Sequence, residues 1–472
     1  MQRKIIAVLL AVVMLFSICT MAGCRRGQKV DNTVSITGDI DLGDDIIEIS
    51  FTHTMGAKLQ DVLNTHIEEF NKIYPNIKIT HQSAGGWSDI NGQINTEITG
   101  DTQPNIAYCY PDHVAMYNLA KAVVVLDNLI ASDKAIAGTN EIIGLTEAQK
   151  NDFIQSYYNE GKVYGDDMMY TMPLNKSTEA LFYNKTFFDQ HGLKVPTTWD
   201  ELWAVCEQIK AIAPNDYPLG YDAEDNWFIT MCEQQKSGYT SAENGGQYLF
   251  NNPENKAMVK KLREMYQKGY FTTQDIYGGY TSKLFTETTD KKCYMCIGST
   301  GGTKNQRSNS DMPDGTYAFE VGVAPIPQLD QNNRKVISQG PNLCILKGNK
   351  TTDQQILASW LFVKFLCTDP VFQGSMSMLQ GYMPVINSVI ENETYAKWLN
   401  DANGTNNLVA AAVKMGMSST DDYFVSPAFR GSSAARSEVG ELLIKCLVTD
   451  KSAGEVDAFL DQAFAEAVDN CG

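Results

Sequence analysis

The sequence predicts an α/β fold with two lobes. The chain has 472 residues, 43% hydrophobic and 20% charged, which is a globular balance at a length that favours more than one domain. Near the start of the body, apolar runs at 46–51 and 77–80 flank a helical pattern, which together form a strand–helix–strand unit. Such units build parallel sheets. No internal repeat of fixed period competes with this interpretation.

The first 23 residues carry the pattern of a secretory signal peptide. Two basic residues precede an aliphatic stretch at 5–18, and a pair of small residues then precedes Cys24. A Cys directly after Ala-Gly resembles the lipoprotein signals of bacteria, in which the thiol receives a diacylglycerol. We therefore expect removal of 1–23, lipidation of Cys24 and a body anchored at the outer face of the cell membrane. The alternative that this segment is not cleaved and forms an anchor helix stays open, although the aliphatic stretch is short for a membrane span.

Local sequence patterns predict a tether and two helices in the next part of the chain. Residues 24–45 are polar, lack periodicity and end in an acidic run, so they predict a flexible tether. Apolar residues at helical spacing fill 59–73, with Thr54 as a candidate cap and Pro75 as a stop. A second helix is expected after Trp87.

Later segments continue the alternation. The apolar run at 106–110 predicts a strand. Thr352 is expected to cap a helix that ends before Pro370. A final helix is expected to begin at Asp450 or Ser452.

Cysteine and histidine patterns weigh against disulfide, redox and metal chemistry. Of the 11 Cys, nine follow Cys24. An odd number of scattered cysteines does not predict a disulfide framework. Cys293 and Cys296 have redox-like spacing, but they lie within an apolar run that favours a buried strand. The five His show no paired spacing, so no metal site and no cofactor are predicted. The net charge of -18 argues against a nucleic-acid partner.

An ordered series of motifs resembles a known family. The motifs are YNEGKVYG at 158–165, MPL at 172–174, LFYNK at 181–185, PTTWDEL at 196–202 and GYMPV at 381–385. Each is weak alone, but in this order they strongly resemble family 1 extracellular solute-binding proteins, which serve ATP-binding-cassette importers for carbohydrates and related polyols. By itself PTTWDEL is a helix entrance, because Asp200 and Glu201 in its first turn suit the helix dipole.

The resemblance implies a periplasmic-binding-protein-like fold of type II, with two discontinuous lobes joined by a hinge. The expected lobes are 46–172 plus 327–369 and 173–326 plus 370–472. The expected crossings lie near 170–178, 324–327 and 368–372. Such a protein is expected to be no enzyme. As a monomer it would close on a ligand that contacts both lobes, and the permease transmembrane subunits would read the closed state.

Candidate ligand contacts lie in loops between regular segments. Trp87 offers an aromatic plate, with core packing as an equal alternative. Asp112 follows a strand end, where α/β sheets bind ligands, although it could simply cap a helix. Ser177 lies at the expected crossing, and Ser299 lies in a Ser/Gly loop suited to hydroxyls or a phosphate. The predicted set is Trp87, Asp112, Ser177, Ser299, Gly340, Tyr382, Arg430 and Arg436.

Part of this set also resembles the glycerol-3-phosphate-binding members of the family. The likeness rests on Ser177, Gly340, Tyr382 and an Arg near the end. Arg430 and Arg436 both qualify, and a guanidinium suits bidentate phosphate recognition. The expected solute is therefore a sugar or a polyol phosphate, with phosphorylation left open.

Two other functions stay open at this point. A cell-surface glycoside hydrolase would place two carboxylates across a cleft, and 56 acidic residues make chance pairs frequent. A solute receptor that feeds a signalling partner would use the same two lobes. No nucleophile elbow, HExxH motif or Walker loop appears in the sequence.

Overall fold

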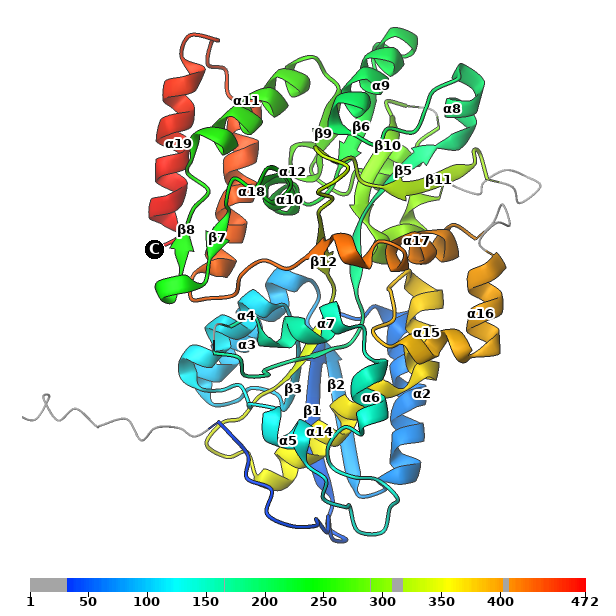
Figure 1. Cartoon of the computed structure of the whole chain (residues 1–472), viewed down its shortest axis with the longest axis vertical. Coiled ribbons are helices and arrows are strands. Elements are labelled where there is room, and N and C mark those ends of the chain that lie inside the picture. Colours follow the sequence, from blue (N-terminus) through cyan, green and yellow to red (C-terminus); the bar gives the residue numbers. More distant parts are fainter. Residues whose placement is uncertain (1–31, 165, 289, 308–316, 402–406) are drawn as a thin grey trace, which may run out of the picture.

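The computed structural model describes residues 32–164, 166–288, 290–307, 317–401 and 407–472. The predicted signal peptide 1–23, Cys24 and the first part of the tether lie outside the described residues. The prediction of a flexible tether is wrong for 32–45, because Leu42 is buried in the core of the first lobe and Ile40 pairs with Ile136 in a β-bridge. Figure 1 shows two lobes stacked along the long axis, each built around its own sheet.

The first lobe contains a five-stranded sheet in the order β2-β1-β3-β13-β4. β1 is parallel to β2 and β3, whereas β13 is antiparallel to β3 and β4. Its strands are β1 (Ile47–His53), β2 (Ile77–Ser83), β3 (Ile106–Cys109), β4 (Met172–Pro173) and β13 (Asn342–Ile345). The helices that pack with this core are α2 (Ala57–Ile73), α3 (Trp87–Gly100), α4 (Pro111–Tyr117), α5 (Asp127–Ala131), α7 (Gln155–Asn159), α14 (Asp353–Thr368), α15 (Pro370–Gln380) and α16 (Glu393–Asn400). The short helix α6 (Glu147–Asp152) lies in the same lobe (Figure 1).

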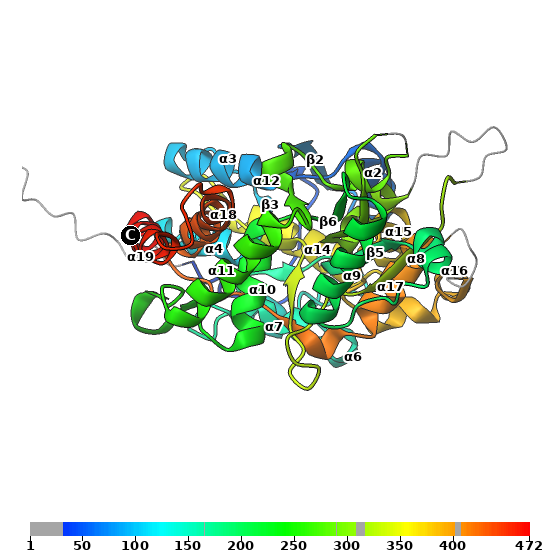
Figure 2. The ribbon, with the colours of Figure 1, turned by 90° about the horizontal axis from the view of Figure 1, so that it is seen from above.

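The second lobe contains a seven-stranded sheet in the order β14-β12-β5-β10-β6-β9, with β11 also paired to β5. Its strands are β5 (Ser177–Asn184), β6 (Tyr217–Tyr221), β9 (Phe271–Thr273), β10 (Cys293–Ser299), β11 (Val321–Pro325), β12 (Val336–Gln339) and β14 (Tyr423–Phe424). A small hairpin pairs β7 (Thr240–Ser241) with β8 (Gln247–Tyr248). The helices are α8 (Lys185–His191), α9 (Trp199–Ile212), α10 (Glu224–Gln235), α11 (Pro253–Gln267), α12 (Gln274–Tyr277), α13 (Ser282–Phe285), α17 (Leu408–Met417), α18 (Ser432–Val448) and α19 (Val456–Asn470). Seen from above, α18 and α19 lie side by side at one edge (Figure 2).

Several predicted elements are confirmed in local detail. α9 begins after Thr198, whose hydroxyl accepts from the Glu201 amide at 3.2 Å while the Glu201 carboxylate accepts from the Thr198 amide at 3.2 Å. The Thr352 hydroxyl likewise caps α14, and Pro370 starts α15. Cys293 and Cys296 lie buried in β10, as their apolar surroundings predicted.

Two helix starts differ from the prediction. α2 begins after Gly56 and not at Thr54, because β1 continues to His53. The last helix begins at Val456, because Ser452 caps a short turn in which its hydroxyl donates to the Glu455 carboxylate.

The sheets show where the chain passes between the lobes. It passes from β4 to β5 within the expected 170–178 segment, and from β12 to β13 between Gln339 and Asn342. The second passage lies later than the expected 324–327, because β11 and β12 both pair with β5. α15 and α16 pack into the first core although they fall in the span 370–472. The exact lobe boundaries stay a prediction.

A buried polar cluster lies where these passages meet. Lys176 Nζ lies 2.8 Å from Glu160 Oε2 and donates to Asn342 Oδ1 at 2.8 Å. The amide of Asn342 donates back to Glu160 Oε1 at 3.2 Å. Lys176 and Glu160 are almost completely shielded from solvent. The cluster therefore fixes three chain segments to one another at the hinge.

Two further features concern the described part of the chain. Its nine cysteines are all free and all buried. No single helix there is long and apolar enough to cross a membrane; α14 and α15 pass that test only as a pair bent by 63°.

Candidate functional site

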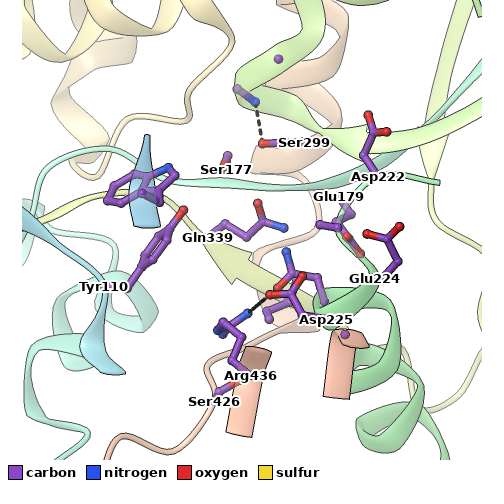
Figure 3. Close-up of a pocket in the computed structure, with 18 of the residues that line it drawn as sticks. Tyr110, Ser177, Glu179, Asp222, Glu224, Asp225, Ser299, Gln339, Ser426 and Arg436 are labelled. Atoms are coloured by element: carbon purple, nitrogen blue, oxygen red, sulfur yellow. Dashed lines mark hydrogen bonds and ion pairs between the residues drawn. The ribbon is translucent and has the colours of Figure 1, made fainter. Parts of the chain in front are cut away.

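A cavity of about 920 Å³ lies between the two lobes. First-lobe residues Trp87, Tyr110 and Asp112 line it, and the wall of the second lobe lies opposite (Figure 3). Its size is near the upper end of small-molecule sites, which span roughly 300–1,000 Å³. It is therefore large enough for a solute of several rings.

The structure brings together seven of the eight predicted contacts. Those that line the cavity are Trp87, Asp112, Ser177, Ser299, Gly340, Tyr382 and Arg436. Arg430 does not line it and is exposed just before α18. Of the two arginines that sequence reasoning offered, only Arg436 can meet a solute in this cavity.

An aromatic plate forms the first-lobe side. The rings of Trp87 and Tyr110 stack with centroids 4.0 Å apart and planes 24° apart. Trp87 is the first residue of α3, and the preceding turn is held because the Gly86 amide donates to the Asp89 carboxylate at 2.8 Å. Trp87 is only half-buried, so its packing on Tyr110 leaves surface exposed to the cavity. Such a plate can stack on the apolar face of a sugar ring.

Arg436 is occupied by acidic partners. Its Nε lies 3.4 Å from Asp112 Oδ2, its Nη1 lies 3.2 Å from Asp225 Oδ2, and Nη1 also donates to Asn226 Oδ1 at 2.6 Å. Burial alone would lower the pKa of Arg436, but the two carboxylates raise it above its ordinary value. Asp112 belongs to α4 of the first lobe and Arg436 to α18 of the second, so the pair joins the lobes.

Carboxylates dominate the second-lobe side. Figure 3 shows Glu179, Asp222, Glu224 and Asp225 together, opposite Tyr110. Burial, with additions from Asp225 and Asp222, raises the pKa of Glu179 to about 8, although its hydrogen bond from Tyr221 opposes the shift. Burial also raises the pKa of Asp222 to about 6, against two hydrogen bonds from Thr281.

Glycine and serine shape the remaining wall. Gly340 has φ +109°, and a Cβ there would lie 2.5 Å from the Asn175 carbonyl oxygen, so only glycine fits. Ser299 accepts from the Gly301 amide at 3.1 Å and thereby caps the short helix at 300–306. Its oxygen is thus partly engaged, which reduces what this loop can offer to a phosphate.

Sequence reasoning missed the acidic wall. Asp222, Glu224 and Asp225 follow β6 directly, and the carboxyl end of a parallel strand is where α/β folds bind ligands. That placement was a usable signal. The sequence contains no such signal for Glu179, because this residue lies within an apolar strand. Among the described residues, no group of three or more His, Cys, Asp or Glu is placed to hold a metal ion.

Comparisons with known proteins place this geometry among binding proteins. A profile described as bacterial extracellular solute-binding protein matches residues 65–403. The sn-glycerol-3-phosphate-binding periplasmic protein UgpB of Salmonella typhimurium is 24% identical over 359 residues, covering 73% of this chain and 76% of that protein. UgpB of Yersinia pestis is 22% identical over 357 residues, with the same coverage of both chains.

Solved structures share the architecture. The GacH receptor of Streptomyces glaucescens, described with acarbose, has a TM-score of 0.69 at 17% identity and covers 90% of this chain and 98% of its own. UgpB from Mycobacterium tuberculosis, in complex with glycerophosphocholine, has a TM-score of 0.67 at 17% identity with the same coverage. Lmo0181 from Listeria monocytogenes, in complex with cycloalternan, has a TM-score of 0.68 at 17% identity, again with that coverage. These likenesses confirm the predicted two-lobed α/β fold.

Proposed function

The chain belongs to the family of bacterial extracellular solute-binding proteins, as its motifs predicted, and we propose that it captures an unphosphorylated carbohydrate between its lobes for an ATP-binding-cassette importer. Members of this family bind solutes outside the cell and do not transform them. The observation that carries the proposal is the cavity itself, because an aromatic plate on one lobe faces hydrogen-bonding side chains on the other. Rings with many hydroxyls suit both surfaces.

The charge of the cavity argues against a phosphorylated solute. Among the described residues that line it, eight acidic side chains accompany a single guanidinium, and no lysine is present. That guanidinium, on Arg436, already contacts two carboxylates. A phosphate would have to displace those partners and then lie close to further negative charge, which is unfavourable at low dielectric. Although the curated relatives are named for glycerol 3-phosphate, we propose a different solute here.

Closure would follow from contacts to both lobes. A solute stacked on Trp87 and hydrogen-bonded to the Glu179 side of the cavity favours the closed arrangement by the difference in its affinity for the two states. The ion pair between Asp112 and Arg436 already spans the cavity and would add to that preference. The permease transmembrane subunits would then receive the closed form.

A ligand screen by thermal shift tests the proposal. Neutral mono- and oligosaccharides should raise the melting temperature, because a ligand at 100 times its Kd stabilises by about 2.7 kcal/mol. Glycerol 3-phosphate at the same concentration should leave the melting temperature unchanged. Stabilisation by glycerol 3-phosphate and by no unphosphorylated sugar would refute the assignment. Formation of a product from a bound glycan would instead support the alternative function of a glycoside hydrolase.

The site of action is proposed from the N-terminal pattern. We propose that Cys24 carries the lipid and that the residues between Cys24 and Asn32 tether the folded body, as a monomer, at the outer face of the cell membrane. Labelled palmitate should enter the full chain and fail to enter the Cys24→Ala variant. Labelling of that variant would contradict the anchor. A receptor that feeds a signalling partner stays a hypothesis with the same fold.

A further inference from the structure

We propose that the captured carbohydrate carries a positively charged amino group, which the acidic wall of the second lobe receives. This inference rests on the proposed capture of a carbohydrate and names its chemical class, an amino sugar. The wall consists of four acidic residues, namely Glu179 from β5, Asp222 directly after β6, and Glu224 and Asp225 from the first turn of α10. Figure 3 shows these four side chains on one side of the cavity.

The charge balance of the cavity is the first argument. Glu160 lines the cavity but is paired with Lys176, and Arg436 is shared between Asp112 and Asp225. Burial lowers the pKa of His113, so that neighbour adds no positive charge near neutral pH. Among the described residues, Glu179, Asp222 and Glu224 form no ion pair with a cation of the chain, and Glu179, with a pKa raised to about 8 mainly by burial, holds a proton near neutral pH in the unliganded protein. Like charges gathered at low dielectric are unfavourable unless a cation joins them.

An unsatisfied acceptor is the second argument. Glu179 is only 2% exposed, and its Oε2 accepts from the Tyr221 hydroxyl at 2.7 Å, but its Oε1 has no hydrogen-bond partner among the described residues. Buried carboxylate oxygens are rarely left unpaired, because the lost hydrogen bonds cost stability. Since Glu179 lines the cavity, a donor on the solute can reach this oxygen.

A second acceptor, outside the acidic wall, is unsatisfied in the same way. Gln306 is 3% exposed, lines the cavity, and its Oε1 has no partner among the described residues. Gln306 Nε2 and Asp222 Oδ2 lie 3.4 and 3.3 Å from the position that a Cβ on Gly298 would take, so the two side chains occupy one corner. An ammonium group offers three donors and no acceptor, which matches a corner rich in acceptors.

The remaining charges explain why a neutral sugar is a poorer fit. The pKa of Glu179 is raised to about 8 mainly by burial, then by Asp225 and Asp222, while the Tyr221 hydrogen bond and Arg436 oppose the shift. A hydroxyl of the solute would leave Glu179 protonated. An ammonium group would favour the ionised carboxylate of Glu179 and pair with it, so the amino member of a matched sugar series should bind best. Trp87 and Tyr110 would meanwhile hold the ring face.

Isothermal titration calorimetry on the mature chain with a matched series tests the inference. The probes are the β-1,4-linked dimers and trimers of glucosamine, of N-acetylglucosamine and of glucose, which differ only in the group at C2. We expect the glucosamine forms to bind at least tenfold more tightly than both neutral series. Equal or tighter binding of a neutral series, or no binding of glucosamine forms at either length, overturns the inference.

A pair of variants ties the preference to the wall. Glu179→Gln keeps the size of the side chain and should bring the amino-to-neutral affinity ratio close to one. Glu264→Gln, the same change on the exposed face of α11 outside the cavity, should keep the ratio of the unaltered chain. An unchanged ratio in Glu179→Gln overturns the assignment to this wall. The ligand series on the unaltered chain decides the case if the variant does not fold.

The outcomes also separate this inference from the proposed function. If neutral sugars bind and glucosamine forms hold no advantage, carbohydrate capture stands and the amino-group inference falls. If glycerol 3-phosphate binds and no unphosphorylated sugar does, both fall.

Discussion

Arg436 on α18 lies 3.4 Å from Asp112 on α4, so one ion pair joins the two lobes across the cavity. Asp112 is 7% exposed and Arg436 is surrounded by acceptors, so water screens the pair only partly. An Arg that the sequence offered as a phosphate receptor is therefore part of the contact between the lobes.

Asp112→Asn should open the unliganded protein. The substitution removes the negative charge from a partly buried ion pair, which stabilises the closed arrangement by on the order of 1 kcal/mol. Small-angle scattering should then report a larger radius of gyration than for the unaltered chain. Asp422→Asn is the matched control, because Asp422 pairs with Arg334 at 2.8 Å within the second lobe. An equal change in both variants would show that the effect is not specific to the lobe contact.

Trp87→Ala should weaken carbohydrate binding. The loss should be about 1–3 kcal/mol, since the substitution removes one ring of the stacked pair with Tyr110. Trp87→Phe should recover part of the affinity, because a smaller ring still stacks. Titration calorimetry measures both. An unchanged Kd in Trp87→Ala would make this side chain a scaffold residue.

Arg430→Ala and Arg436→Ala should differ sharply. Arg430 is exposed and outside the cavity, so its loss should change affinity less than about threefold. Arg436→Ala leaves Asp112 and Asp225 without their shared cation and should weaken binding by about 2–5 kcal/mol. Calorimetric Kd values with one sugar test both variants. Equal losses would place Arg430 at the site after all.

Glu179 should make the unliganded protein less stable as the pH rises. Its pKa is about 8 in the fold against an ordinary 4.5, so the folded chain holds a proton that the unfolded chain has released between these values. The stabilisation is full below pH 4.5 and is lost as the pH passes 8. The slope is at most about 1.4 kcal/mol per pH unit for one proton.

The comparison with Glu179→Gln isolates this effect. Asp222, with a pKa of about 6, and His53, whose pKa burial and His81 lower to about 4, titrate in both chains, so their contributions cancel in the difference. Melting temperatures measured from pH 6.5 to 8 should fall for the unaltered chain and stay flatter for Glu179→Gln. Parallel curves would contradict the role of Glu179.

Lys176→Met should be strongly destabilising. It leaves the Glu160 carboxylate buried without its cation, which typically costs about 3–5 kcal/mol. The double variant with Glu160→Gln should recover much of the loss, because the isolated charge is gone. Chemical denaturation with a cycle of single and double variants measures the coupling. Additive effects would show that the two groups do not interact.

Local sequence signals predicted much of the fold. The capping pair Thr198 and Glu201 and the stop at Pro370 act within one turn of helix, so they can be read without knowledge of the rest of the chain. The family resemblance added the two lobes, which no local pattern contains. The later passage at Gln339 was missed because it depends on the pairing of β12 with β5, residues far apart in sequence.

The site residues that the sequence predicted are those whose residue type is informative by itself. Trp87 and Gly340 stand out by shape and by backbone freedom, and both line the cavity. The charge of the cavity was predictable only in part, because the position of Asp222 and Asp225 after β6 was a usable signal, whereas Glu179 joins them only in the folded chain. Only the fold reveals that Arg436 already contacts Asp112 and Asp225, which is why we propose a solute without a phosphate, a point that the sequence left open.

The burial of every cysteine in the described part of the chain has a practical consequence. A thiol introduced on the surface of each lobe would be far more accessible to maleimide dyes than the native thiols. A donor and an acceptor fluorophore could therefore be attached without removing any native cysteine. Energy transfer between the two fluorophores would make this protein an optical sensor of the solute that it binds.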